Sequence, residues 1–438
     1  MDIDSVLDGS GSSRFKRRTL TDRIRHFTPS WFAASMGTGA VSLIFHNFPY
    51  GSKTTLRYIA TGFFVLDLCL FVSFNALSIT RYVMYPQIWG LMIRHPVQSL
   101  FLACYPMAFA TIIGESLNLY QDWNLGGVSF LYFIWGMCLL NVILTMTSTF
   151  GLLYYTITRH KQSLESMTAV WLLPVVQPVV GASTTATMAA VLLDVSPRHA
   201  LLTLCLAFGQ LMIGLPLAFM IGTIYLLRLI VYGLPSSPFI TSMFLILGPL
   251  GQGGIAFIRI SEVIADMSAA GLLPPPFFTD PYTASIVKFM GLTMALFLWC
   301  FGLWWSFFAI AAIIEVFSRN RVPFGVPFWG MTFPIGVYVL LTLQLAVTLD
   351  SKFFRVTGTI LGLALILLWA CIFVRTVFLA FEGSMFYAPC LDDMPLPANP
   401  AQTKDTEPEP AIENPGTSSA DRLPTVSIRN EETVAQPS

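Results

Sequence analysis

The sequence WGMTFPIGVY, residues 329–338, lies inside an apolar run at 326–348. Crossing a bilayer takes about 20 such residues, so this run is long enough to span one. Pro334 stands in the middle of the run, and Phe333 directly precedes it. A proline within a helix removes a backbone donor and clashes with the carbonyl one turn back, so the stretch predicts a bent membrane helix. Such a helix either lines a pore and plugs it with the phenylalanine ring, or packs as a kinked element in a core.

The composition places the whole chain in lipid. Of its 438 residues, 55% are hydrophobic and 11% are charged, and the mean hydropathy is +0.69. Soluble domains carry about 25% charged residues, so a soluble fold is excluded. The net charge of zero argues against a nucleic-acid partner. The seven cysteines include no CxxC pair, and no disulfide framework is expected.

Ten apolar runs of spanning length follow one another along the chain. They occupy residues 28–46, 56–79, 98–119, 128–157, 167–193, 201–232, 240–267, 285–316, 326–349 and 356–381. Every odd-numbered run carries proline, whereas only the sixth of the even-numbered runs does. Interrupted helices are tolerated at membrane depth where they face protein or a water-filled cavity. We therefore predict an all-α integral membrane protein, with ten transmembrane helices arranged as five helical hairpins in quasi-five-fold fashion around a central pore.

The ends of the chain differ in composition from the spans. Residues 1–26 are polar and basic, and the even-numbered connections carry more Lys and Arg than the odd-numbered ones. The positive-inside rule then places both termini in the cytoplasm. Residues 384–438, rich in Pro, Glu, Asp, Ser and Thr, are expected to form a disordered cytoplasmic tail. The transport domain is predicted to be residues 27–383.

Polar side chains without charge gather in the odd-numbered runs. GASTTAT at 181–187 is the densest group, and the first run carries hydroxyls around its glycines. Hydroxyls and amides at helix breaks hold an anion by hydrogen bonds and helix-end dipoles, or else they let helices pack closely. The predicted lining and substrate residues are Thr38, Gly39, Gln177, Ser183, Thr184, Thr185, Gln252 and Arg259.

Charged residues inside the spans are few, and each is a functional hypothesis by default. Arg259 either faces the pore and attracts an anion, or pairs with Glu262 one turn later. Asp67 and Glu115 either belong to a proton relay or hydrogen-bond to neighbouring helices.

Motifs of catalysis and metal binding are missing from the sequence. It contains no HExxH, no Gly-rich phosphate loop, no GxSxG and no His/Cys cluster at metal spacing. We therefore expect no enzyme activity, no cofactor and no metal. A membrane enzyme, and a receptor or structural membrane protein, remain as less favoured alternatives.

Several motifs resemble those of one transporter family. FTPSWFAASMGTGAVS (27–42) resembles the first-helix signature of the tellurite-resistance/dicarboxylate transporter family, in particular its fungal members, and WGMTFP (329–334) is similar to its ninth helix. LLPVVQPVVGAS (172–183) and GPLGQGG (248–254) look more like the fungal sulfite efflux pumps than the fungal malate permeases. The resemblance covers residues 27–381 and includes plant guard-cell anion channels and bacterial homologues.

The resemblance implies a mechanism. In the family, five inner helices surround a pore that a phenylalanine on the ninth helix occludes; here that residue is Phe333, next to Pro334. It also implies a homo-oligomer, often a trimer, with one pore in each protomer. We therefore expect a plasma-membrane exporter of sulfite or bisulfite, whose partners are a small inorganic anion and membrane lipids. The alternative is a proton-coupled malate or dicarboxylate permease of the same family.

Overall fold

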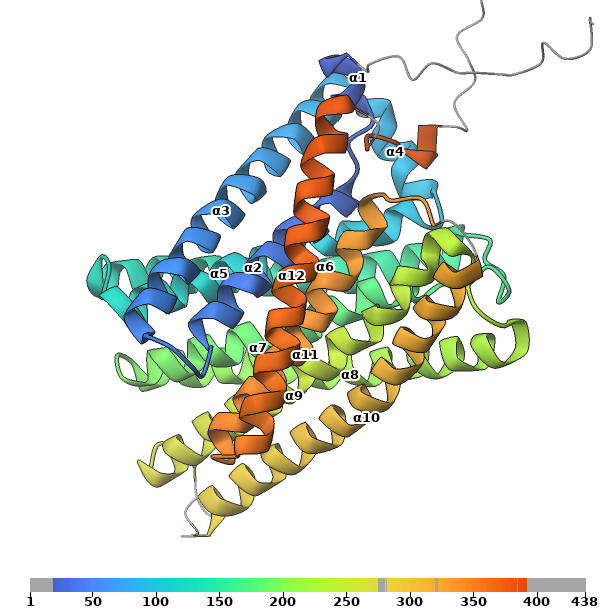
Figure 1. Ribbon diagram of the computed structural model, residues 1–438. Helices are drawn as coiled ribbons and strands as arrows, with labels where there is room; N and C mark the ends of the chain where they lie inside the picture. Colours follow the sequence, from blue (N-terminus) through green and yellow to red (C-terminus); the bar gives the residue numbers. More distant parts are fainter. Residues whose placement is uncertain (1–18, 275–279, 281, 320–321, 384, 392–438) are drawn as a thin grey trace, which may run out of the picture. The chain divides into compact units, whose positions relative to one another are not determined.

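The structure, a computed structural model, describes residues 19–274, 280, 282–319, 322–383 and 385–391. In these ranges the chain forms helices and no β-strand (Figure 1). Nine helical segments of the described chain are long and apolar enough to cross a membrane. The predicted run at 28–46 forms one shorter segment in addition. The protein is therefore an all-α integral membrane protein, as the sequence predicts.

Each odd-numbered run forms a 3₁₀ segment that continues directly into an α-helix, and we call these the inner helices. They are η2 (Pro29–Trp31) with α2 (Phe32–His46), η3 (Gln98–Ala103) with α5 (Cys104–Trp123), η4 (Ala169–Leu172) with α7 (Leu173–Leu193), η5 (Ser237–Ile246) with α9 (Leu247–Ala269), and η7 (Val326–Phe328) with α11 (Trp329–Thr348).

Each even-numbered run forms a single long α-helix, and we call these the outer helices. They are α3 (Lys53–Met84), α6 (Gly127–Arg159), α8 (Pro197–Tyr232), α10 (Thr283–Arg319) and α12 (Lys352–Glu382). Three short elements complete the described chain: α1 (Leu20–Arg25), α4 (Pro86–Arg94) and η8 (Pro389–Leu391).

Burial separates the two sets of helices. The most apolar windows of the four longer inner segments are 72% to 89% buried, whereas those of the outer helices are 11% to 39% buried. The outer helices expose large apolar side chains such as Phe133, Phe307 and Phe378. Because water does not tolerate so large an apolar surface, these faces are lipid-facing. The predicted alternation of inner and outer helices is confirmed.

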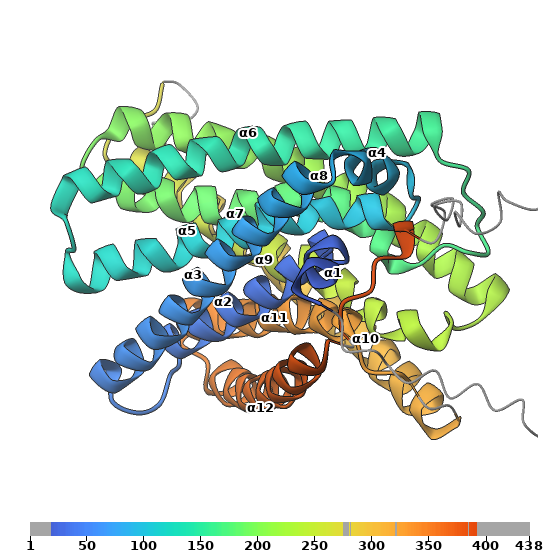
Figure 2. The same cartoon turned by 90° about the horizontal axis from the view of Figure 1, so that it is seen from above.

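The inner helices pack in a closed sequence of neighbours. α2 contacts α5, α5 contacts α7, α7 contacts α9, α9 contacts α11, and α11 returns to α2. Each inner helix also packs against the outer helix that follows it in the chain, which gives five hairpins. Figure 2 shows α6 and α12 on opposite sides, with α7, α9 and α11 between them.

The inner helices are interrupted where their 3₁₀ segments meet the α-helices, and not at prolines in the middle of the α-helices. Pro106, Pro174 and Pro249 stand within the first three residues of their α-helices, immediately after the 3₁₀ segments. Proline is tolerated in the first turn of an α-helix, because its fixed φ suits a helix and its ring meets no earlier α-helical turn. Pro178 and Pro334 stand inside helices that continue through them. The common break is the change from 3₁₀ to α geometry at the start of each inner helix.

The chain after α12 packs on the helices as far as Leu391. The ring of Phe386 stacks on Trp31 with 5.2 Å between the centroids, and the backbone N–H of Ala388 donates to Nδ1 of His26 over 3.3 Å. Of the predicted tails at 1–26 and 384–438, residues 1–18, 384 and 392–438 lie outside the described residues.

Candidate functional site

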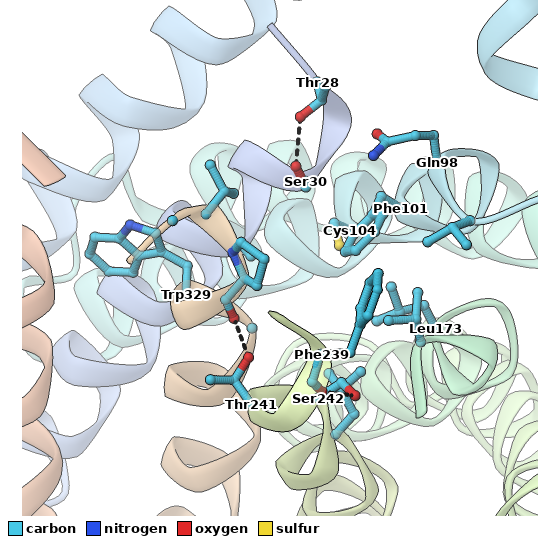
Figure 3. Close-up of a pocket in the computed structure, with 18 of the residues that line it drawn as sticks. Thr28, Ser30, Gln98, Phe101, Cys104, Leu173, Phe239, Thr241, Ser242 and Trp329 are labelled. Carbon is cyan, nitrogen blue, oxygen red and sulfur yellow. Dashed lines mark hydrogen bonds between the residues drawn. The ribbon is translucent and has the colours of Figure 1, made fainter. Parts of the chain in front are cut away.

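A cavity of about 470 Å³ opens where the inner helices begin, and we call it the vestibule. All five inner helices contribute to its wall through their 3₁₀ segments and first α-turns. Figure 3 shows side chains from several of these elements turned toward the same space. The segment after α12 adds Met385, Tyr387 and Pro389 to the wall. The vestibule is therefore built at the 3₁₀ starts, where the helices have not yet closed on one another.

The vestibule ends at Phe333. The residues furthest along each inner helix that line it are Met36, Met107, Val176, Gly248 and Pro334. The side chain of Phe333 lines the cavity at this level and is only 3% exposed. The five helices all continue beyond this level. Phe333 and Pro334 both line the wall of the vestibule, at the level of the lining residues furthest along the inner helices.

The rotation of α11 that brings Phe333 to this position is fixed by Trp329. Its indole Nε1–H donates to Oγ1 of Thr376 on α12 over 3.0 Å, and the side chain is 1% exposed. On the same helix, Gly336 packs against α2, where an added Cβ would lie 2.8 Å from Cβ of Ala40. Contacts on two sides therefore hold the stretch that carries Phe333.

The polar groups of the vestibule include hydroxyls, the amide of Gln98 and the imidazole of His95, whose Nδ1 accepts from the backbone N–H groups of Val97 and Gln98 over 3.2 and 3.1 Å. Thr28 and Ser30 share a hydrogen bond of 2.6 Å, and Thr241 donates to the carbonyl of Pro327 over 3.1 Å (Figure 3). The side chain of Gln98 is 8% exposed, and its Oε1 has no hydrogen-bond partner among the described residues. An unpaired buried amide oxygen is costly, so Gln98 is a side chain with spare hydrogen-bonding capacity at the cavity.

Thr38 and Gly39 lie outside the vestibule wall, against outer helices. Thr38 accepts a hydrogen bond of 3.1 Å from Nε1 of Trp369 on α12. An added Cβ at Gly39 would lie 2.7 Å from Oδ2 of Asp67 on α3. Both residues therefore serve the contact of α2 with its outer neighbours in this structure.

Gln177 and Thr185 also face outer helices. Nε2 of Gln177 donates to Oγ of Ser148 on α6 over 3.1 Å, and Oγ1 of Thr185 donates to Oε1 of Gln210 on α8 over 3.0 Å. Gln177 and Thr185 are each 1% exposed. The hydrogen bonds to Ser148 and Gln210 join α7 to two outer helices, while Oε1 of Gln177 has no partner among the described residues.

Ser183 and Gln252 are the predicted polar residues that the structure brings together. The hydroxyl of Ser183 donates to Oε1 of Gln252, so the bond joins the inner helices α7 and α9. Both side chains are buried. Thr184, the next residue, is half-buried and donates to the carbonyl of Val180 over 3.4 Å.

Arg259 forms the local ion pair that was one of its two interpretations. Its Nη1 lies 3.1 Å from Oε2 of Glu262, and its Nη2 donates to Oε1 of Gln344 on α11 over 3.1 Å. About a third of each charged side chain is exposed, 34% for Arg259 and 32% for Glu262. The pair therefore lies at an accessible place between α9 and α11, away from the vestibule.

Most residues that line the vestibule are not part of the polar motifs from which the site was predicted. Thr28, Ser30, Gln98 and Ser242 precede the apolar helices or lie in their first turns, so none belongs to a conspicuous polar cluster. A proline or a hydroxyl residue immediately before an apolar run could have indicated these positions, because such residues favour helix starts. The described residues contain no group of three or more His, Cys, Asp or Glu side chains that could hold a metal ion.

Comparison with known proteins identifies the family. Residues 26–377 match the model of the voltage-dependent anion channel family. The sulfite efflux pump of Trichophyton rubrum is 33% identical over 83% of this chain and 93% of its own length, and that of Arthroderma otae is 34% identical over 85% and 95%. The malic acid transport protein of Schizosaccharomyces pombe is 26% identical over 80% of this chain and 77% of its own. The vestibule and its five inner helices therefore belong to a member of the voltage-dependent anion channel family.

Proposed function

We propose that this protein exports sulfite, as the singly charged bisulfite, across the plasma membrane through a path in each protomer that Phe333 gates. The observation that carries the proposal is the vestibule, which draws its wall from all five inner helices and ends at Phe333. Further support comes from two relatives named sulfite efflux pumps, which match along more than nine tenths of their length. Both termini of each protomer are cytoplasmic in this proposal, so the vestibule opens to the cytoplasm.

Helix dipoles attract an anion into the vestibule. All five inner helices begin there, so the positive ends of five helix macrodipoles surround the cavity. The hydroxyls of Thr28 and Ser30 and the Nε2–H groups of Gln98 are the donors available to an anion, since the unpaired Oε1 of Gln98 can only accept. Because dipoles and hydroxyls carry no full charge, an anion is attracted without being trapped. The inside-negative membrane potential then drives export, at about 2.3 kcal/mol per charge per 100 mV.

Beyond Phe333 the path would follow the half-buried polar positions of the inner helices. These are Thr184 and Thr187 on α7, Arg259 and Glu262 on α9, and Gln344 on α11. Arg259 is already neutralised by Glu262 at 3.1 Å, so this half offers an anion hydrogen bonds and a weak net charge. In the proposed orientation it leads to the outside.

The gate is tested by replacing Phe333 with alanine. Removing the ring deletes the plug, so anion flux through Phe333→Ala should rise at least severalfold. The measurement is sulfite efflux from proteoliposomes under an imposed potential, normalised to the amount of reconstituted protein. Phe307→Ala is the matched control, because Phe307 lies on the outer helix α10 and is 68% exposed. Unchanged flux in a folded Phe333→Ala protein would refute the gate.

The substrate is tested separately from the gate. The same vesicles are assayed with sulfite, malate, nitrate and chloride. Sulfite flux above malate flux is expected, because a dicarboxylate carries two charges and the wall of the vestibule offers it no Lys or Arg partner among the described residues. Faster malate transport would instead indicate that this protein transports malic acid, like the Schizosaccharomyces pombe relative. The result for Phe333 would be unaffected.

A further inference from the structure

Two acidic side chains are buried side by side between α2, α3 and α5, away from the vestibule wall. Asp67 on α3 is 0% exposed and Glu115 on α5 is 3% exposed. At Gly39 of α2, an added Cβ would lie 2.7 Å from Oδ2 of Asp67 and 3.0 Å from Cβ of Thr111, which is one turn before Glu115 on α5, so the two carboxyl groups are neighbours. On α2, the hydroxyl of Ser35 donates to Oδ1 of Asp67 over 2.6 Å. Each of the three helices thus contributes a group to one polar site inside the membrane domain.

The site has fewer hydrogen bonds than two carboxylates require. Oδ2 of Asp67 and both oxygens of Glu115 are buried and accept no hydrogen bond from the other described residues. The hydroxyl of Ser42 lies near Glu115 but donates to the carbonyl of Ala60 over 2.9 Å. An ionised carboxylate without donors is strongly destabilised in an apolar interior, and two adjacent carboxylates cannot both be ionised. A proton held between the two groups removes one charge and supplies the missing hydrogen bond.

The other titratable groups at this end of the three helices form a separate cluster. Oδ1 of Asp122 on α5 lies 3.0 Å from Nε of Arg57 on α3, and its Oδ2 lies 3.0 Å from Nε2 of His46 on α2. Lys53 of α3 donates to the carbonyl of Phe48. Arg57 and Lys53 are thus engaged with Asp122 and a backbone carbonyl at the helix ends. Neither forms an ion pair with Asp67 or Glu115 in the described structure.

A small cavity joins this cluster to Glu115. Its volume is about 20 Å³, and its wall includes Ser42, His46, Arg57, Glu115 and Asp122. A cavity needs roughly 10–15 Å³ to hold one water molecule, so the space suffices for one. A water there would connect Glu115 with the solution at the ends of α2 and α5, the face opposite to the vestibule.

We propose that Asp67 and Glu115 form a proton-binding site that exchanges with the solution through this small cavity. The proton is carried by Glu115, whose O–H donates to Oδ2 of Asp67, while Oδ1 of Asp67 accepts from Ser35. In exchange, one O–H bond of Glu115 breaks and the proton passes to water at Ser42 and His46; the reverse step restores it. The proton forms a third O–H bond on that water, and the resulting hydronium ion passes the proton on to the solution.

The site is connected to the vestibule through α2. Ser35 holds Asp67, and the next residue, Met36, lines the vestibule at the level of Phe333. Loss of the proton leaves two adjacent negative charges on Asp67 and Glu115. Their repulsion would push α3 and α5 apart and disturb the contact of Asp67 with Ser35 on α2. If the proposed sulfite export is correct, its rate therefore depends on the pH at the face of the small cavity.

The proton is measured directly by infrared spectroscopy of the purified full chain. The wild-type protein at neutral pH should show the carbonyl stretch of a protonated carboxylic acid, shifted on transfer to D₂O because the site exchanges with solvent. Glu115→Gln should abolish this band, and Asp67→Asn should shift it. Glu315→Gln is the control, since Glu315 is exposed on α10 and pairs with Arg319; it should leave the band unchanged.

Absence of the band in the wild-type protein, or its persistence in the double variant Asp67→Asn/Glu115→Gln, overturns the proposal. The wild-type measurement decides even if the variants do not fold. It requires no transport, so it also decides if sulfite proves not to be the substrate. In vesicles that do transport sulfite, Glu115→Gln should abolish the dependence of flux on pH at the small-cavity face, whereas Glu315→Gln should retain it.

Discussion

At the scale of single residues, the polar side chains of the inner helices are used mainly to attach outer helices. Thr38 binds Trp369 of α12, Gln177 binds Ser148 of α6, and Thr185 binds Gln210 of α8. Lipid chains are as apolar as leucine, so the hydrophobic effect does not hold such helices together, and packing and interhelical hydrogen bonds take its place.

Thr38→Val should therefore weaken the fold without changing which anion is transported. The substitution keeps the volume but leaves the buried indole N–H of Trp369 without its acceptor, which costs about 1–3 kcal/mol. Thermal unfolding in detergent should show the loss, while the ratio of sulfite to chloride flux in vesicles stays as in the wild type.

The control for this residue is Thr38→Ser, which retains the hydroxyl and should remain close to wild-type stability. A changed flux ratio in Thr38→Val with unaltered unfolding would contradict the structural role and return Thr38 to the substrate path.

The orientation of individual side chains was the part of the site that the sequence could not predict. An inner helix such as α7 is buried nearly all round, so apolar periodicity does not mark the face that points to a cavity. Phe333 was proposed as a site residue because Pro334, directly after it, is unusual in the middle of a membrane helix. Gln98 has no such neighbour, and its place at the vestibule depends on the long-range packing of η3.

At the scale of helices, the spans were predicted to within a few residues. The run expected at 98–119 is Gln98–Trp123, and that expected at 326–349 is Val326–Thr348. Hydropathy succeeds here because backbone groups in lipid must be paired by helical hydrogen bonds, so each span is a long, continuous apolar run. The 3₁₀ starts were not predicted, since 3₁₀ and α segments place nearly the same residues in the same apolar run.

The contact of α9 with α11 depends on Gly251. An added Cβ there would lie 2.7 Å from the backbone carbonyl atoms of Val337 and 2.8 Å from the amide nitrogen of Tyr338, and a backbone cannot move aside as a side chain can. Gly251→Ala should destabilise the protein by about 1–3 kcal/mol or more, the range found for overpacked cores. The free energy change is read from thermal or denaturant unfolding in detergent.

Gly62→Ala provides the comparison on the outer helix α3, where no atom lies within 4 Å of the added Cβ. It should stabilise the protein slightly, because alanine favours a helix over glycine by about 0.5–1 kcal/mol. Equal stability of the two variants would show that α9 and α11 do not approach as closely as described.

At the scale of the whole molecule, the five hairpins put all inner-helix starts on one face. The predicted topology makes that face cytoplasmic. In a chain whose seven cysteines are replaced, a cysteine at Ser163 should react with a membrane-impermeant thiol reagent only from inside, and one at Asn47 only from outside. Both positions are exposed in connections between helices. Reaction of both from the same side would exclude the proposed path, since an even number of crossings would then separate them.

The closed sequence of inner helices was predicted at this scale from the proline pattern, although the reason proved different. Repetition of one bent-plus-straight unit suggested five similar hairpins, and in the described chain each inner helix packs against the outer helix that follows it. The property they share is the burial of the first helix of each unit and the exposure of the second. The alternation of buried and exposed helices along the chain therefore predicted the arrangement of the hairpins better than any single sequence motif did.

The unequal lengths of the two helix sets have a consequence for the surrounding bilayer. The outer helices α8 and α10 have 36 and 37 residues, which gives them a length of about 55 Å. The hydrocarbon layer is only about 30 Å thick, so such rods either lean or project from it. Leaning by a different angle absorbs a change in acyl-chain length at small cost. We therefore expect the outer helices to change their tilt with bilayer thickness, while the inner α-helices, of 15 to 23 residues, need not tilt to fit within it.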